Sequence, residues 1–155
     1  PELVSVYAQQ LINQNAMDEC TALLTTALER QWDERLVLLY GEARDAQPAA
    51  QLETAEEWLA RHGESPALLL TLGRLARRNR LTDRARSYLE KSLVLGASAA
   101  AHAELGTLFE EAGDSARALN HCRQALELCR NLHHPVLSHQ GGSAPGTSGA
   151  SDYGY

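Results

Sequence analysis

Positive charge is concentrated in one short stretch of a chain that is acidic overall. The sequence has 14 Lys and Arg against 20 Asp and Glu, with a formal net charge of −6. Half of the basic residues fall within residues 74–91, as Arg74, Arg77, Arg78, Arg80, Arg84, Arg86 and Lys91. In a helix, Arg74, Arg77 and Arg78 share one face, and their planar guanidinium groups suit carboxylates, including the propionates of a porphyrin.

Charged residues on both sides of this cluster complete a candidate partner-binding groove. Arg35 and Glu42 belong to the segment before the cluster, and Glu110 belongs to the segment after it. The predicted groove residues are Arg35, Glu42, Arg74, Arg77, Arg78 and Glu110. Two interpretations stay open: the charges neutralise one another on a solvated face, or the basic centre binds an anionic ligand or an acidic peptide.

Histidine and cysteine gather near the C-terminal end, at His121, Cys122, Cys129, His133, His134 and His139. Their spacing matches neither the C-x-x-C pairs of zinc sites nor the C-x-x-C-H pattern of covalent haem. We expect Cys122, four residues after Ala118, to pack in the core. A helix places Cys122 and Cys129 ~10 Å apart, too far for a disulfide. The sequence predicts no metal site, and haem or porphyrin stays an alternative ligand.

The acidic pairs Glu56-Glu57 and Glu110-Glu111 suit solvated helix faces rather than catalysis. The sequence has no nucleophile paired with a base, no phosphate-binding glycine loop and no metal-binding helix motif, so we expect no enzyme. The acidic net charge argues against nucleic-acid binding. No continuous apolar stretch reaches the ~20 residues that cross a bilayer. Because the chain begins at Pro1 rather than Met, we expect it to be part of a longer protein.

An internal repeat organises the elements that carry these residues. Gly106 follows Gly73 by 33 residues, and Ala118 follows Ala85 by the same interval. Stepping backwards, Gly41 precedes Gly73 by 32 residues, and Ala8 precedes Gly41 by 33. Each unit reads as two amphipathic helices joined by a tight turn, because its apolar residues recur at spacings of three and four. The sequence therefore predicts an all-α, right-handed solenoid of four helix-turn-helix pairs over residues 1–131.

The repeat also predicts local features. A glycine inside a helix costs ~1 kcal/mol relative to alanine, so we expect Gly73 and Gly106 where two helices touch. Gly113 is expected in a left-handed turn, followed by a cap at Asp114 or Ser115, and Thr82 and Asp18 are expected to cap their own helices.

The second unit and the C-terminal end depart from the repeat. The second unit is predicted to have residues 48–50 in its turn and a shortened second helix over residues 54–62. Residues 132–155 are predicted to form a flexible tail rich in Gly and Ser, because they hold too little apolar surface to offset the entropy of ordering.

Repeats of this length, with a small residue in the first helix and Ala early in the second, resemble the tetratricopeptide repeat. A narrower resemblance covers residues 3–131. It is carried by the strings YAQQLINQNAMDE, LLTTALERQWDERLVLLYGEA, LARHGESPALLLTLGRLA and RARSYLEKSL. These resemble the C-terminal domain of the HemY-type, haem-biosynthesis-associated tetratricopeptide proteins of proteobacteria. The most specific element is Trp32-Asp33 before the helix Leu36–Gly41, while Asn15 stands where glycine is more usual.

This resemblance implies a function and a location. It implies a scaffold domain for protein-protein interaction whose partners are enzymes of haem or protohaem biosynthesis. It also implies a membrane-anchored part, absent from this chain, at the cytoplasmic face of the bacterial inner membrane, with this chain alone soluble. The alternative function is direct porphyrin or haem binding through the basic groove. Because the first helix begins abruptly, we also expect self-association through the exposed ends of the solenoid.

Overall fold

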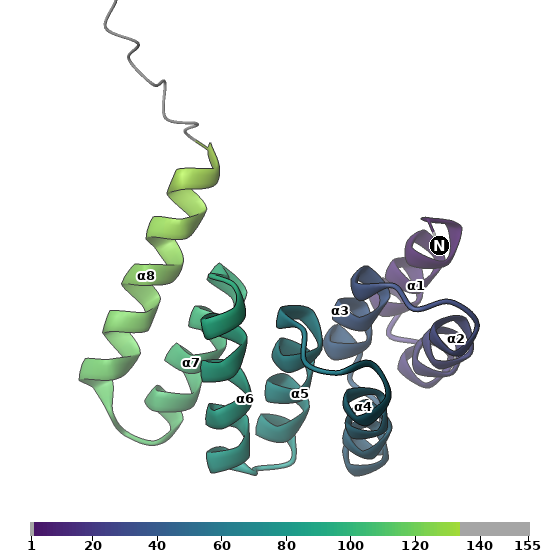
Figure 1. Cartoon of the computed structure of the whole chain (residues 1–155), viewed down its shortest axis with the longest axis horizontal. Coiled ribbons are helices and arrows are strands. Elements are labelled where there is room, and N and C mark those ends of the chain that lie inside the picture. The colour runs from purple at the N-terminus through teal and green to yellow at the C-terminus, as the bar shows by residue number, and fades with distance from the viewer. Residues whose placement is uncertain (1, 134–155) are drawn as a thin grey trace, which may run out of the picture.

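The computed structural model describes residues 2–133, which form eight helices (Figure 1). Their bounds are α1 Glu2–Asn13, α2 Met17–Arg30, α3 Glu34–Glu42, α4 Pro48–His62, α5 Pro66–Arg78, α6 Thr82–Leu95, α7 Ala99–Glu111 and α8 Ser115–His133. The helix α8 runs two residues past the predicted end of the solenoid at residue 131, so residues 132 and 133 are helical and not part of a tail. The remainder of the predicted tail lies outside the described residues.

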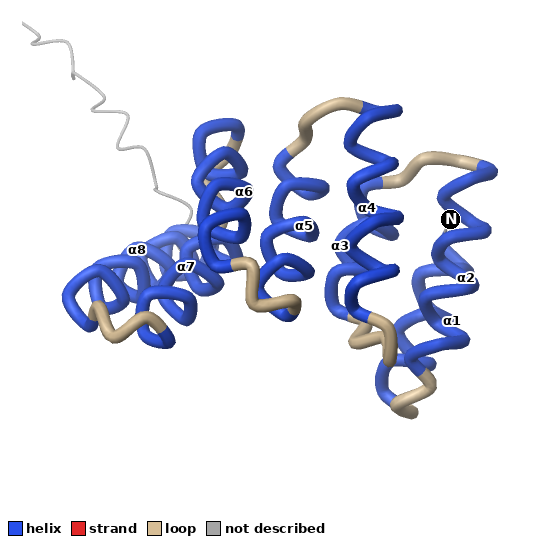
Figure 2. Tube along the Cα trace, turned by 90° about the horizontal axis from the view of Figure 1, so that it is seen from below, coloured by secondary structure: helices blue, strands red, loops and turns tan. Residues whose placement is uncertain are grey.

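The helices pack in consecutive pairs joined by short turns (Figure 2). The odd-numbered helices α1, α3, α5 and α7 follow one another side by side, and each even-numbered helix α2, α4 and α6 also packs against the odd-numbered helix that follows it. This is the helix-turn-helix arrangement that the 33-residue spacing predicts, and it confirms the all-α fold class. In the part of the chain that the structure describes, no helix is both long and apolar enough to cross a bilayer.

Polar side chains cap the first turns of the later helices. Ser65 Oγ accepts a hydrogen bond from the backbone N–H of Leu68 at 3.2 Å, and Ser98 Oγ accepts one from Ala101 at 3.3 Å. Asp114 accepts from Arg117 in the same way, which confirms the predicted cap of α8. Each bond satisfies one of the N–H groups that a helix start leaves without a partner.

Two predicted caps are wrong. The helices α6 and α2 begin at Thr82 and Met17, so Thr82 and Asp18 lie inside the first turns and neither caps a helix. Asp18 instead accepts a hydrogen bond from the backbone N–H of Ala46, in the loop that joins α3 to α4, at 3.4 Å. Proximity in the sequence suggested the local role, whereas the packing of that loop on α2 sets the observed one.

The turns within three of the four pairs use the left-handed region at corresponding positions. Asn15 has a φ of 60° and Gly113 a φ of 79°, as the sequence predicts. Arg80 has a φ of 59° although it has a side chain, and the sequence analysis missed it. Each of these turns closes when the residue after the left-handed one donates to the last turn of the preceding helix, as Leu81 N–H does to Ala76 O at 2.9 Å.

Small residues bring paired helices together where the repeat predicts it. A Cβ built on Gly73 lies 2.5 Å from Cγ and Cδ2 of Leu89 on α6. A Cβ built on Gly106 lies 3.1 Å from Cys122 Sγ on α8. Leu89 and Cys122 are themselves 33 residues apart, so both pairs use the same contact, and the expected closeness at Gly73 and Gly106 is confirmed.

The second pair is built differently. The helices α3 and α4 are the one consecutive pair among the described helices without close backbone contact, and the rings of Tyr40 and Trp58 fill the space between them, with centroids 4.6 Å apart. Gly41 packs instead against Thr71 on α5, whose hydroxyl donates to Val37 O at 2.9 Å. Aromatic side chains thus pack between α3 and α4 where the two later pairs have a close glycine contact. Gly41 instead allows α3 to approach α5 of the next pair.

The prediction of a shortened α4 is wrong. The helix α4 has 15 residues and begins at Pro48. Proline is favoured at the first position of a helix, because the N–H that it lacks has no partner there and its φ is already helical. Pro48 therefore starts α4 rather than forming part of the turn before it.

Candidate functional site

The helices α3, α5 and α7 enclose a surface hollow of about 340 Å³, which we call the α5 groove. It is lined by Glu34, Leu38, Glu42, Pro66, Ala67, Leu70, Arg74, Ser98 and Ala100. Its floor is apolar, and charged groups stand at its edges. Of the six predicted partner-binding residues, the structure brings Arg74 and Glu42 to this groove.

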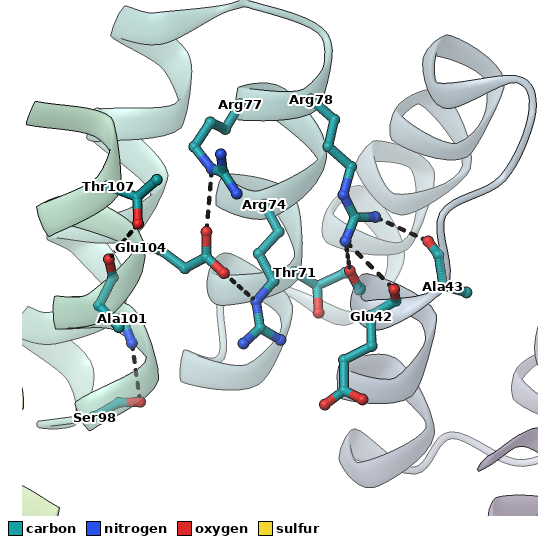
Figure 3. Close-up of polar contacts among 12 residues, drawn as sticks. Glu42, Ala43, Thr71, Arg74, Arg77, Arg78, Ser98, Ala101, Glu104 and Thr107 are labelled. Carbon is teal, nitrogen blue, oxygen red and sulfur yellow. Dashed lines mark hydrogen bonds and ion pairs between the residues drawn. The ribbon is translucent and has the colours of Figure 1, made fainter. Parts of the chain in front are cut away.

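Arg74 presents part of its guanidinium group to the groove. Its Nε donates to Glu104 Oε1 on α7 at 2.9 Å, and 16% of its side chain is exposed. In Figure 3 its two terminal nitrogens point away from Glu104, and within the described chain they donate to no side chain or carbonyl. The ion pair therefore fixes the orientation of Arg74 while leaving the fork that binds carboxylates accessible.

Arg77 completes an ion-pair network with α7. Its Nε lies 3.2 Å from Glu104 Oε2, and its Nη1 lies 2.9 Å from Glu111 Oε1 (Figure 3 shows the first contact). Glu104 thus serves both arginines, and neither Glu104 nor Glu111 was among the predicted site residues. The predicted acidic partner, Glu110, is exposed and does not line the groove.

Arg78 holds the end of α3 rather than facing the groove (Figure 3). Its Nη2 donates to Gly41 O at 2.6 Å, and its Nη1 donates to Ala43 O at 2.8 Å. Gln51 Nε2, from α4, donates to Ala43 O at 2.9 Å and to Tyr40 O at 2.8 Å. These donors satisfy carbonyls that a helix end leaves unpaired. Burial lowers the pKa of Arg78 to about 10, so the side chain stays cationic at neutral pH.

Arg35 lies on α3 and forms an ion pair with Asp33, two residues before it in the sequence. Its Nη2 pairs with Asp33 Oδ2 at 3.0 Å, and Asp33 also caps α3 by accepting from the backbone N–H of Arg35. The hydrogen bond from Arg35 is the main cause that lowers the pKa of Asp33. Arg35 is 65% exposed at its side chain and does not line the α5 groove.

Two further groove residues follow from their spacing to the predicted Glu42. Glu34, Leu38 and Glu42 are four residues apart along α3 and therefore share one face. Two carboxylates and an aliphatic side chain on one helix face are a pattern that can be read before the fold is known. On the α7 side the repeat register also places Ala100 on the groove face, whereas Ser98 reaches the groove only through the packing of α7 on α5.

His102, His121 and Phe109 form a separate cluster between α7 and α8. The Nδ1 atoms of His102 and His121 lie 2.9 Å apart, and the His121 ring stacks on Phe109 with centroids 5.5 Å apart. Burial lowers the pKa of both histidines, and the charge of His121 lowers the pKa of His102 further. Cys122 contacts Gly106 but is exposed, because in the described chain no helix follows α8 to cover it. The expectation of a core position for Cys122 is therefore wrong.

This cluster is distinct from the α5 groove. Among the described residues, no group of three or more His, Cys, Asp or Glu is placed to hold a metal ion. His134 and His139 lie outside the described residues, as does the side chain of His133. The one predicted histidine that the structure describes, His121, engages His102.

The described chain is an all-helical domain of eight helices packed in consecutive pairs, as helical repeats are built. No family model matches the sequence, and comparison with curated proteins finds no match either.

Proposed function

We propose that this domain is a protein-interaction scaffold that binds an extended acidic segment of a partner in the α5 groove. The observation that supports this most is the guanidinium group of Arg74, which is oriented by Glu104 and open to an apolar groove. An oriented guanidinium group loses little side-chain entropy when it binds a carboxylate, and the apolar floor offers contact for the neighbouring side chains of the peptide. Repeat domains commonly bind partners on the surface formed by successive first helices.

The acidic residues on the α3 side of the groove restrict which peptide sequences can bind. Glu34 and Glu42 are exposed on α3, on the other side of the groove from Ser98. A peptide with a carboxylate at Arg74 and a basic residue a short distance away satisfies both charges. A uniformly acidic peptide meets repulsion at Glu34 and Glu42, so the arrangement favours mixed charge and selects against simple polyanions.

The partner class and location rest on the sequence resemblance. The strings shared with HemY-type proteins support a scaffold that belongs to a membrane-anchored protein and gathers enzymes of haem biosynthesis. Direct haem binding has weaker support, because Arg77 and Arg78 are engaged by acidic residues and by helix carbonyls, and His121 lies in another cluster.

Peptide selection with matched variants tests this function. A displayed library of random peptides is selected against the domain, and the selected peptides are titrated against Arg74→Gln, Glu104→Gln and Glu53→Lys. Arg74→Gln and Glu104→Gln break the same ion pair, but only the first removes the charge from the groove. Glu53 is exposed on α4, outside the groove, and serves as the surface control.

We expect Arg74→Gln to weaken binding about tenfold or more, because a hydrogen bond to a charged group is worth roughly 1.5–3 kcal/mol. Glu104→Gln keeps an amide oxygen that can accept from Arg74 Nε and orient the side chain, so this variant and Glu53→Lys should keep binding. Equal losses in Arg74→Gln and Glu104→Gln would mean that the ion pair acts on stability alone, and the proposal would fail. A parallel absorbance titration with haem addresses the other ligand class: a saturable shift lost in Arg74→Gln, without any selected peptide, would favour the porphyrin function instead.

A further inference from the structure

The outward face of α1 exposes positions that the later units bury. In the repeat register, Leu3 corresponds to Leu36, Leu68 and Ala101, and Tyr7 corresponds to Tyr40, Leu72 and Leu105. The six later residues are at most 3% exposed, whereas Leu3 is 82% and Tyr7 is 51% exposed. Val6, between them, is 60% exposed. The face of α1 therefore has the composition of an internal contact surface without a partner inside the described chain.

The last described helix, α8, likewise exposes positions that the corresponding helices of earlier units bury. Its Cys122 corresponds to Leu24 and Leu89, and its Leu126 corresponds to Leu28 and Leu93. Leu24, Leu28 and Leu89 are buried and Leu93 is half-buried, whereas Cys122 is exposed and Leu126 is 64% exposed. Leu119 lies on the same face as Leu126, seven residues before it, and is 52% exposed.

The internal contact between α6 and α7 shows how such surfaces fit. Leu89 and Leu93 of α6 join one hydrophobic cluster with Ala101 and Leu105 of α7. The positions that correspond to Leu89 and Leu93 on α8 are Cys122 and Leu126, and those that correspond to Ala101 and Leu105 on α1 are Leu3 and Tyr7. The first and last described helices thus carry the two halves of a contact that the molecule already makes internally.

Shape and charge support the same pairing. Two apolar hollows of about 350 and 250 Å³ adjoin along α1 and α2, since both are lined by Val4 and Leu23. The segment α1–α2 carries four acidic residues and one arginine, while α8 carries three arginines and one glutamate. The opposite charges of the two ends favour contact between unlike ends and disfavour contact between two copies of the same end.

We propose that two copies of this chain associate head to tail, with α8 of one copy packed on α1 of the next. The contact reproduces the α6–α7 contact between neighbouring units, so the solenoid continues from one chain into another. Such an interface is heterologous, and each added copy leaves one free end of each kind. This inference does not depend on the α5 groove, which lies on other surfaces and stays open in the assembly.

A mixing experiment tests this polarity. The mass of the full chain is measured by sedimentation over a range of concentrations, with a thiol reductant present so that Cys122 cannot crosslink copies. Val6→Glu blocks the α1 end and Leu126→Glu blocks the α8 end, and both residues are exposed enough for the fold to tolerate the change. Val94→Glu, at an 85% exposed residue of α6 outside both ends, is the matched control.

We expect the mass of the full chain and of Val94→Glu to rise with concentration beyond that of a dimer. Val6→Glu and Leu126→Glu should each stay monomeric. In an equimolar mixture, the open α8 end of Val6→Glu should pair with the open α1 end of Leu126→Glu. The resulting dimer has no open end left, so nothing larger should form. A full chain that is monomeric at every concentration overturns the proposal. So does a dimer of Val6→Glu alone, which shows contact between two α8 ends, or a dimer of Leu126→Glu alone, which shows contact between two α1 ends.

Discussion

Gly73 and Gly106 occupy the same repeat position, but alanine should affect them in opposite directions. A Cβ at Gly73 lies 2.5 Å from Cγ and Cδ2 of Leu89, which is fully buried and has no open space into which to turn. A Cβ at Gly106 lies 3.1 Å from the Sγ of Cys122, which is exposed and can rotate away. The space around each glycine, rather than its repeat position, therefore decides whether alanine stabilises or destabilises the domain.

The magnitudes follow from two opposing effects. Replacing a helical glycine by alanine gains about 1 kcal/mol of helix propensity, whereas overpacking a tight contact costs about 1–3 kcal/mol. Because a 2.5 Å contact is a severe clash, the upper part of that cost applies at Gly73, and Gly73→Ala should lower the free energy of unfolding by about 1–2 kcal/mol. Gly106→Ala should leave it unchanged or raise it by up to about 1 kcal/mol. The variants should differ in melting temperature by several degrees, at about 3 °C per kcal/mol for a chain of this size.

Urea unfolding followed by circular dichroism measures both variants, and a double variant checks the cause. In a Leu89→Ala background the clash at position 73 is removed, so Gly73→Ala should there stabilise the domain by about 1 kcal/mol. Equal effects of Gly73→Ala and Gly106→Ala, or the same loss at Gly73 with and without Leu89, would refute the reasoning from packing.

Two further predictions concern polar groups. Because burial lowers the pKa of His102 and His121 below the usual value of 6.5, the unfolded chain binds more protons. The free energy of unfolding should therefore fall as pH drops from 7.5 through about 6, and a variant with both histidines changed to Gln should show a flatter pH profile in urea titrations. Arg78→Gln removes the donors to the carbonyls at the end of α3 and should destabilise by about 2 kcal/mol, whereas Arg80→Gln in the exposed turn should change little. Similar melting temperatures for the two arginine variants would contradict the capping role.

The sequence predicted what depends on local periodicity. Gly73 and Gly106 could be placed at helix contacts because a glycine inside a helix needs a packing reason and because both fall at one repeat interval. The turn at Gly113 and the cap at Asp114 depend on neighbouring residues alone, so they too could be read from the sequence. The left-handed conformation of Arg80 could have been found from its 33-residue distance to Gly113, although its residue type suggested otherwise.

The roles of the arginines could not be predicted in the same way. Helical spacing places Arg74, Arg77 and Arg78 on one face, but it does not show which neighbour each one meets. Arg78 reaches the carbonyl of Gly41 because α3 lies against one side of α5, and Arg77 reaches Glu111 because α7 lies against the other. These partners are more than 30 residues away, so they depend on how the pairs stack.

The stacking also changes what a charge-reversal experiment reports. The sequence suggests that replacing all three arginines by Glu leaves the fold intact. In the structure, that change removes the cap of α3 and places acidic side chains beside Glu104 and Glu111. Loss of binding in such a variant would therefore mix stability with recognition, whereas Arg74→Gln with Glu104→Gln as its control separates them.

The central claim is that the α5 groove binds a peptide of mixed charge through a carboxylate at Arg74. Its most direct test is the change in backbone amide NMR signals when a selected peptide is titrated into the domain. The largest shifts should fall on the groove segments of α3, α5 and α7, around Leu38, Leu70 and Ala100, and in Arg74→Gln they should need about tenfold more peptide or be lost. Shifts confined to the outer faces of α1 and α8, with the groove signals unmoved, would contradict the claim.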